Sequence, residues 1–328
     1  MKVYRLVIAQ IVLAAVQDVL AAVAAGALAC AIMTMRCGLL GWERLRALRT
    51  ASSTVLVFSA LVYLWLQAAI MSGSPLADAG SAITTVVTQS HFDRAWSLGF
   101  AGALPATLSG QRKESGSALF ALGLMLWVAA KAATSYAADS GDFSWREAIH
   151  VVHLFATAFW AGSVIVDAIL LTGMLRVASG GARQRAAFCS ALSHLATSAL
   201  VIVLVTGLYS VLQDGPHVGA AVLQMMYGRV LAGKLACVAL AILLGGWNRA
   251  VVLPNLRTCA EQNGPGCLAH QRRFDVALAV EAVAMLAVLS LAALLGHTAP
   301  TVGSSRSISV FPMPNDRAPH HFSTALPG

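Results

Sequence analysis

Long apolar runs alternate with short polar connections along the chain as far as residue 297. A helix that crosses a bilayer needs about 20 mostly apolar residues, and several of these runs reach that length. The pattern therefore predicts an all-α, polytopic integral membrane helical bundle of about eight transmembrane helices. Their expected ranges are 6–33, 51–71, 92–110, 117–137, 147–174, 189–212, 230–252 and 274–297.

The composition supports a membrane protein and argues against a soluble one. Of the 328 residues, 58% are hydrophobic and 11% are charged, and the mean hydropathy is +0.74. The formal net charge of +8 would suggest nucleic acid as the partner of a soluble protein. Here the basic residues lie in short connections between apolar runs, so they indicate orientation in a lipid bilayer, and we expect no nucleic-acid partner.

Basic residues are distributed unevenly between successive connections. Residues 72–91, 138–145 and 213–228 contain no Lys or Arg, whereas the connections that alternate with them contain several. Because Lys and Arg favour the cytoplasmic side, both termini are expected to lie on the outer side of the membrane. Five of the ten prolines follow residue 297, and we expect residues 301–328 to form a disordered periplasmic tail.

The most informative run is residues 146–176, which reads REAIHVVHLFATAFWAGSVIVDAILLTGMLR. His150 and His153 are three residues apart, so they lie on one face of a helix. Trp160 and Asp167 follow at helical spacing on roughly the same face. Since ionisable groups within a membrane span are costly, this face predicts a transport pathway or a ligand site.

Histidine and methionine gather at the predicted outer ends of the spans. Imidazole and thioether ligands suit copper, and thioether favours Cu(I). A structural role stays open, because an imidazole also fits an interface where one end of the ring is wet. The candidate metal ligands are His150, His153, His91, His217, Met225 and Met226.

Charged residues within the expected spans form a second group of candidates. They are interpreted as structural or gating charges, which either pair with one another or relay protons or cations. An anionic cofactor such as haem, with an axial His and Arg on its propionates, fits some of the same residues. The main candidates are Lys234, Glu281, Arg229 and Asp167, and Asp18 and Lys131 accompany them.

Two enzyme classes lack their signatures in this sequence. There is no GxxxxGK[ST] phosphate-binding loop, which argues against ATP-driven pumping. There is also no GxSxG nucleophile motif of a serine hydrolase. We therefore expect a protein that is not an enzyme, with a haem-dependent oxidoreductase as the alternative.

Residues 146–300 contain four informative phrases, which are HLFATAFWAGSVI at 153–165, VTGLYS at 205–210, YGRVLAGKLACVAL at 227–240 followed by NRAVVLP at 248–254, and RRFDVALAVEAVAMLAVLSLAALLGHTAP at 272–300. They resemble the copper resistance protein D (CopD) family of bacterial inner membranes, and they occur in that family's order. The resemblance implies a multi-pass protein of the bacterial inner membrane with both termini periplasmic. Because it covers residues 146–300, we expect an N-terminal four-span region over 1–145 and a CopD-like four-span region over 146–300.

The resemblance implies copper ion transport across the inner membrane, in copper uptake, homeostasis and resistance. Copper would be accepted at a periplasmic His/Met site, often from a separate periplasmic copper-binding protein of the CopC type. A broader likeness, to HemJ-like membrane proteins, implies a haem b-binding redox protein as the alternative. A non-transporting membrane component of the copper response is the third hypothesis. The resemblance carries onto His153, Trp160, Tyr227, Arg229, Lys234 and Glu281.

Overall fold

The regular structure of this chain is helical throughout the part that is described. The computed structural model describes residues 2–39, 42–73, 75–89, 91–109, 116–133, 144–171, 182–214, 226–262 and 267–298. The all-α prediction is confirmed for these residues. The predicted disordered tail, residues 301–328, lies outside them.

The helices follow the predicted apolar runs and mostly extend beyond them. Two π-helical turns, η2 and η5, continue α6 and α9 without a break. The elements in chain order are α1 (Lys2–Arg36), α2 (Trp42–Ser72), α3 (Gly80–Gln89), α4 (His91–Ser109), α5 (Gly116–Ala133), α6 (Trp145–Val166), η2 (Asp167–Leu171), α8 (Ala182–Asp214), α9 (Met226–Trp247), η5 (Asn248–Val252), α10 (Leu253–Gln262) and α11 (Cys267–Leu295).

Six helical segments among the described residues are long and apolar enough to cross a membrane. The segment Ser117–Ala133 of α5 is a shorter apolar helix, and α4 contains Pro105. The protein is thus a multi-pass helical bundle by length and composition, while the count of eight spans and the side of each terminus stay predictions. The six segments are Tyr4–Arg36, Trp42–Ser72, Trp145–Ile169, Arg183–Gln213, Met226–Cys259 and Ala269–Leu295.

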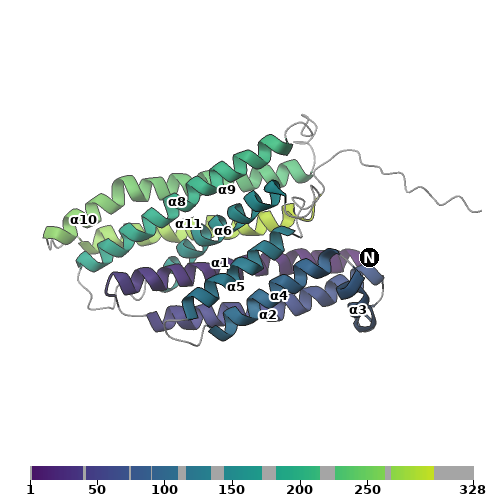
Figure 1. The fold of residues 1–328 in the computed structure, drawn as a ribbon. Helices are drawn as coiled ribbons and strands as arrows, with labels where there is room; N and C mark the ends of the chain where they lie inside the picture. Colours follow the sequence, from purple (N-terminus) through teal and green to yellow (C-terminus); the bar gives the residue numbers. More distant parts are fainter. Residues whose placement is uncertain are drawn as a thin grey trace, which may run out of the picture.

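The long helices run side by side in one elongated bundle, and α3 and α10 lie at its opposite ends (Figure 1). This placement agrees with the charge pattern, because α3 belongs to a connection without Lys or Arg and α10 to a basic one. The central helix is α1, which contacts α2 on one side and α6 and α11 on the other. It therefore joins the predicted region 1–145 to the predicted region 146–300, and the boundary between them stays a prediction.

The crossing of α1 and α6 is close because glycine occupies both helices there. A Cβ atom added at Gly162 would lie 1.7 Å from the Ala22 carbonyl oxygen, and one added at Gly26 would lie 2.1 Å from the Gly162 carbonyl carbon. Such contacts between small residues are typical of membrane helices, whose backbones can then approach closely. The main hydrophobic core follows from this crossing and joins α1, α6, α8 and α11.

Large apolar side chains also cover the outside of the bundle. A soluble monomer rarely exposes apolar surface on this scale, whereas lipid tails match it. The surface therefore agrees with a bilayer as the surrounding solvent. Examples from five helices are Phe58, Leu108, Val205, Leu243 and Val283.

Candidate functional site

The start of α6 is fixed one turn and a half before its two histidines. Ser144 is the N-cap residue, and its side-chain oxygen accepts a hydrogen bond from the Glu147 backbone N–H at 3.2 Å. The acidic Glu147 in the first turn also suits the positive end of the helix dipole. The helix is thus well formed where it presents His150 and His153.

The two imidazoles lie on one face of α6, as their spacing predicts. Their ring planes are 8° apart, and their ring centroids are separated by 6.2 Å. Both side chains are half-buried inside the bundle. We call this part of the bundle, where α6 carries His150 and His153 and α9 carries Lys234, the histidine end.

A threonine on α8 orients His153. Its Oγ1 lies 2.9 Å from His153 Nδ1, and the same hydroxyl donates to the Ile202 carbonyl oxygen at 2.6 Å. Because the hydroxyl proton of Thr206 is used in that second bond, its oxygen accepts from an Nδ1–H of His153. This tautomer leaves the lone pair on Nε2, which is the form of imidazole that binds a metal.

Positive charges surround the histidine pair, and an acid partly offsets them. Lys234 acts electrostatically on both imidazoles, and Lys131 and Arg146 act on His150. Asp18 of α1 forms an ion pair with Lys131 and also acts on Lys234. Asp18 thereby lowers the positive potential that an arriving cation would meet.

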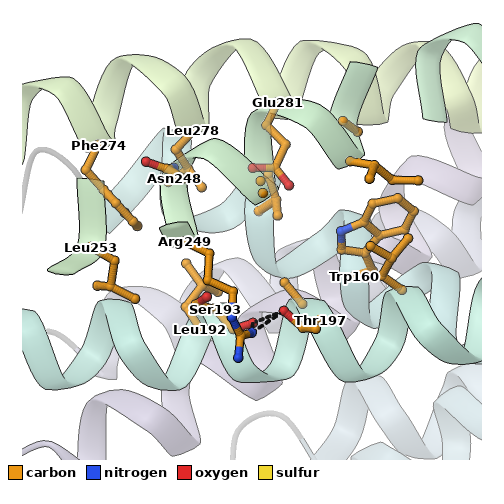
Figure 2. A pocket seen from close by; sticks show the side chains of 17 residues that line it. Trp160, Leu192, Ser193, Thr197, Asn248, Arg249, Leu253, Phe274, Leu278 and Glu281 are labelled. Carbon is orange, nitrogen blue, oxygen red and sulfur yellow. Dashed lines mark hydrogen bonds between the residues drawn. The ribbon is translucent and has the colours of Figure 1, made fainter. Parts of the chain in front are cut away.

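A half-open pocket of about 190 Å³ lies further along α6. Figure 2 shows Glu281 entering it from α11 on the side of Trp160, while Arg249 turns towards α8. Arg249 Nη1 donates to the Ser193 carbonyl oxygen at 3.2 Å and to Thr197 Oγ1. Glu281 and Trp160 are 5% and 2% exposed, so both belong to the interior.

A second acidic site occupies the opposite end of α6. Asp167 begins the π-helical turn η2, is 2% exposed, and has an Oδ1 atom without a hydrogen-bond partner among the described residues. Asp275 of α11 acts electrostatically on it and accepts a hydrogen bond from Gln271 Nε2 at 2.9 Å. A π-helical turn often marks a functional position within a helix.

The structure brings only some of the predicted site residues together. His150, His153 and Lys234 meet at the histidine end, while Asp167 and Glu281 lie further along the bundle. On α9, Arg229 is exposed and Met226 is 63% exposed. His217 and Met225 lie outside the described residues, as does the side chain of His91, the first residue of α4.

Two site residues were missed by sequence reasoning although the sequence held a signal for each. Thr206 belongs to the phrase VTGLYS, and Asn248 begins the phrase NRAVVLP. Short polar residues occur in many membrane helices, so neither stands out without its partner. Their roles follow from tertiary contacts, since Thr206 meets His153 and Asn248 lines the pocket with Glu281.

Across the described ranges, no three His, Cys, Asp or Glu side chains converge as metal ligands. The histidine pair therefore supplies two nitrogen ligands within this part of the chain. The fold defines a multi-pass helical membrane protein by length and composition, and α6 carries two neighbouring imidazoles inside the bundle.

Comparison with known proteins shows a similarity to one family. Residues 186–295 match the family model described as Copper resistance protein D. The chain is also 25% identical over 263 residues to "Copper resistance protein D" of Pseudomonas syringae pv. tomato, a match that covers 78% of this chain and 84% of that protein. The chain is therefore similar to copper resistance protein D, and the family model covers its residues 186–295.

The matched segment begins in α8, so it contains Thr206, Lys234, Asn248 and Glu281 but neither of the histidines on α6. No solved structure matches the chain.

Proposed function

We propose that this protein transports copper ions across the bacterial inner membrane and accepts them at His150 and His153. The family supports copper as the substrate, and the multi-pass bundle supports a membrane role. The observation that carries the assignment to these residues is the orientation of His153. Its Nδ1 is bound to Thr206, which leaves Nε2 of a half-buried imidazole free to bind a metal.

Two imidazoles on one helical turn are an adequate first site for a transported ion. Conduction requires binding that is favourable enough for entry and weak enough for release, and a pair of nitrogen ligands meets both demands. Nitrogen ligands accept copper in either oxidation state. The neighbouring Lys234 opposes a retained positive charge, so it favours onward movement of the ion.

Copper is first captured at the outer surface, before it reaches the histidine pair. On the predicted topology the histidine end is periplasmic, and Met226 is an exposed thioether at the start of α9. Met226, with His91, His217 and Met225, would collect copper from the periplasm or from a separate CopC-like copper-binding protein. Uptake of this kind serves copper homeostasis and resistance, and it assigns no catalysed reaction to the chain.

The direct test is the metal content of the purified protein. We expect copper to co-purify stoichiometrically, or to bind after addition under reducing conditions, without a Soret band in the visible spectrum. His150→Ala together with His153→Ala should remove that copper. His194→Ala is the matched control, because this histidine is exposed on α8.

Two results would contradict the proposal. Unchanged copper content in the double alanine variant would place the ligands elsewhere. A Soret band lost on substitution of His153 would make the protein a haem protein, the alternative that the copper resistance family does not favour.

A further inference from the structure

Glu281 is an acid placed where a membrane protein normally avoids one. It lies near the middle of the span Ala269–Leu295 and is 5% exposed. Its side chain enters the pocket between α6, α8, α9 and α11, beside Trp160 (Figure 2). A buried carboxylate at this depth costs free energy unless a cation or a proton neutralises it.

No basic side chain neutralises Glu281 among the residues that the structure describes. Its carboxyl group takes part in no hydrogen bond or ion pair there. Among the described residues that line the pocket, Arg249 is the other charged one. That guanidinium is turned away to Ser193 and Thr197 of α8.

The backbone of α9 leaves room for the carboxyl group. A Cβ atom added at Gly245 would lie 3.2 Å from Glu281 Oε1, closer than most real contacts of that kind. The absence of a side chain at Gly245 therefore keeps the carboxyl oxygen accessible from the pocket. It also gives the group space for a small bound species.

A second polar group in the same pocket lacks a partner. Asn248 is 5% exposed, and its Oδ1 has no hydrogen-bond partner in the described part of the chain. It begins the π-helical turn η5, which sits at the pocket wall. A buried acceptor without a partner is destabilising, so this pocket lacks a hydrogen-bond donor for Asn248.

The donor set identifies the occupant. Carboxylate and amide oxygens suit protons and hard cations, whereas Cu(I) prefers sulfur and imidazole. A hard metal ion takes about six or more oxygen ligands, and this pocket offers a single carboxylate. A proton needs only the carboxyl group itself.

We propose that Glu281 is a proton-binding site that couples proton movement to copper movement in the opposite direction. The inference rests on the proposed transport function. As a copper ion leaves the histidines and passes Trp160, the O–H bond of the Glu281 carboxyl group breaks and the proton moves to water at the open side of the pocket. The carboxylate then balances the charge of the passing ion, and the group takes up a proton again once copper has left.

Infrared difference spectroscopy of the copper-free protein in lipid tests proton binding by itself. A pH titration of the wild-type protein should show a protonated carboxyl band that shifts in heavy water. Glu281→Gln should remove this band, and Glu281→Asp should move it, which guards against a glutamine variant that does not fold. Glu261→Gln is the control, because Glu261 is an exposed acid of α10 outside the pocket. A titration in which Glu281→Gln retains every carboxyl band overturns the proposal.

Copper uptake into vesicles tests the coupling. Wild-type protein should take up copper faster when the vesicle lumen is more acidic than the medium, and an ionophore that collapses the pH gradient should abolish the acceleration. Glu281→Gln should lose the response to the gradient, while Glu261→Gln should keep it.

The outcomes separate the two proposals. If copper uptake by the wild-type protein does not depend on the pH gradient, the proposed proton coupling is overturned, while the proposed copper transport still stands. Absence of copper uptake under every gradient overturns both, whatever the infrared spectra show for the carboxyl group.

Discussion

The two halves of the bundle differ in how their acidic side chains are neutralised. Arg49 Nε and Trp127 Nε1 of the first half also lack hydrogen-bond partners among the described residues, but the acid Asp18 is paired there. Among helices α1–α5, Lys131 pairs with Asp18, Gln10 bonds to Gln67, and Arg49 lies 4.8 Å above the Phe120 ring. From α6 onwards, Glu281 forms no ion pair among the described residues, and Asp167 has an Oδ1 without a hydrogen-bond partner there.

We infer from this difference that the paired groups have a structural role and that the unpaired acids have a functional one. Paired groups join helices and hold a register, whereas an unpaired buried acid is maintained at a cost that function must offset. The region matched by the copper resistance family model, residues 186–295, falls within the second half. Within the first half, α2 packs against α1, and α1 in turn packs against α6.

The largest effect is expected where the two halves meet. Gly162→Val places side-chain atoms against the Ala22 carbonyl oxygen, which a Cβ at this position would already approach to 1.7 Å. Overpacking usually costs about 1–3 kcal/mol, and a backbone clash that cannot relax exceeds that range. We expect little folded protein, measured by size-exclusion yield and thermal unfolding in detergent.

The matched control is Gly246→Ala, because nothing lies within 4 Å of a Cβ added there. If Gly162→Val folds with the stability of this control, the close crossing of α1 and α6 is wrong.

A smaller loss of stability is expected when the ion pair between Asp18 and Lys131 is broken. Asp18→Asn removes the carboxylate charge that pairs with Lys131, and the two side chains are 17% and 30% exposed. Because this partial exposure lets solvent screen the charges, the expected destabilisation is about 1–2 kcal/mol. Asp18→Asn combined with Lys131→Met should recover part of that loss in thermal unfolding. Additive losses in the double variant would show that the pair contributes nothing as a pair.

The smallest expected effect concerns the orientation of His153. Thr206→Val removes the oxygen that accepts a hydrogen bond from His153 Nδ1, while the shape of the side chain at position 206 is nearly retained. Loss of such a supporting hydrogen bond typically weakens metal binding about 10–100-fold, and we expect the lower end. Thr206→Ser keeps the hydroxyl and should bind copper as the wild-type protein does. Competition titrations against a Cu(I) chelator measure the difference, and equal affinity of Thr206→Val would remove Thr206 from the site.

Much of the fold was predictable because membrane helices appear in the sequence as continuous apolar runs. Each expected helical range from 6–33 to 274–297 overlaps a described helix, while the number of membrane spans stays a prediction. The starts were less accurate, since α2 begins at Trp42 within a connection that was expected to be a basic loop. Arg49 explains this extension, because its guanidinium packs over Phe120 and its burial continues the helix into the bundle.

The candidate site was predictable only where one helix carries it. The spacing of His150 and His153 is local, so the shared face follows from the sequence. The contacts of Thr206 with His153, and the common pocket of Asn248 and Glu281, join helices that are far apart in the sequence. Hydrophobic periodicity contains no information about such pairs, so these contacts could be identified only from the structure.

Copper uptake by vesicles that contain the purified protein tests the central claim most directly. Wild-type protein and His194→Ala should take up copper at the same rate, whereas His150→Ala with His153→Ala should fall to the rate of protein-free vesicles at equal protein content. Uptake by the double variant at the wild-type rate would contradict the account, because copper would then enter the membrane without the histidine pair on α6.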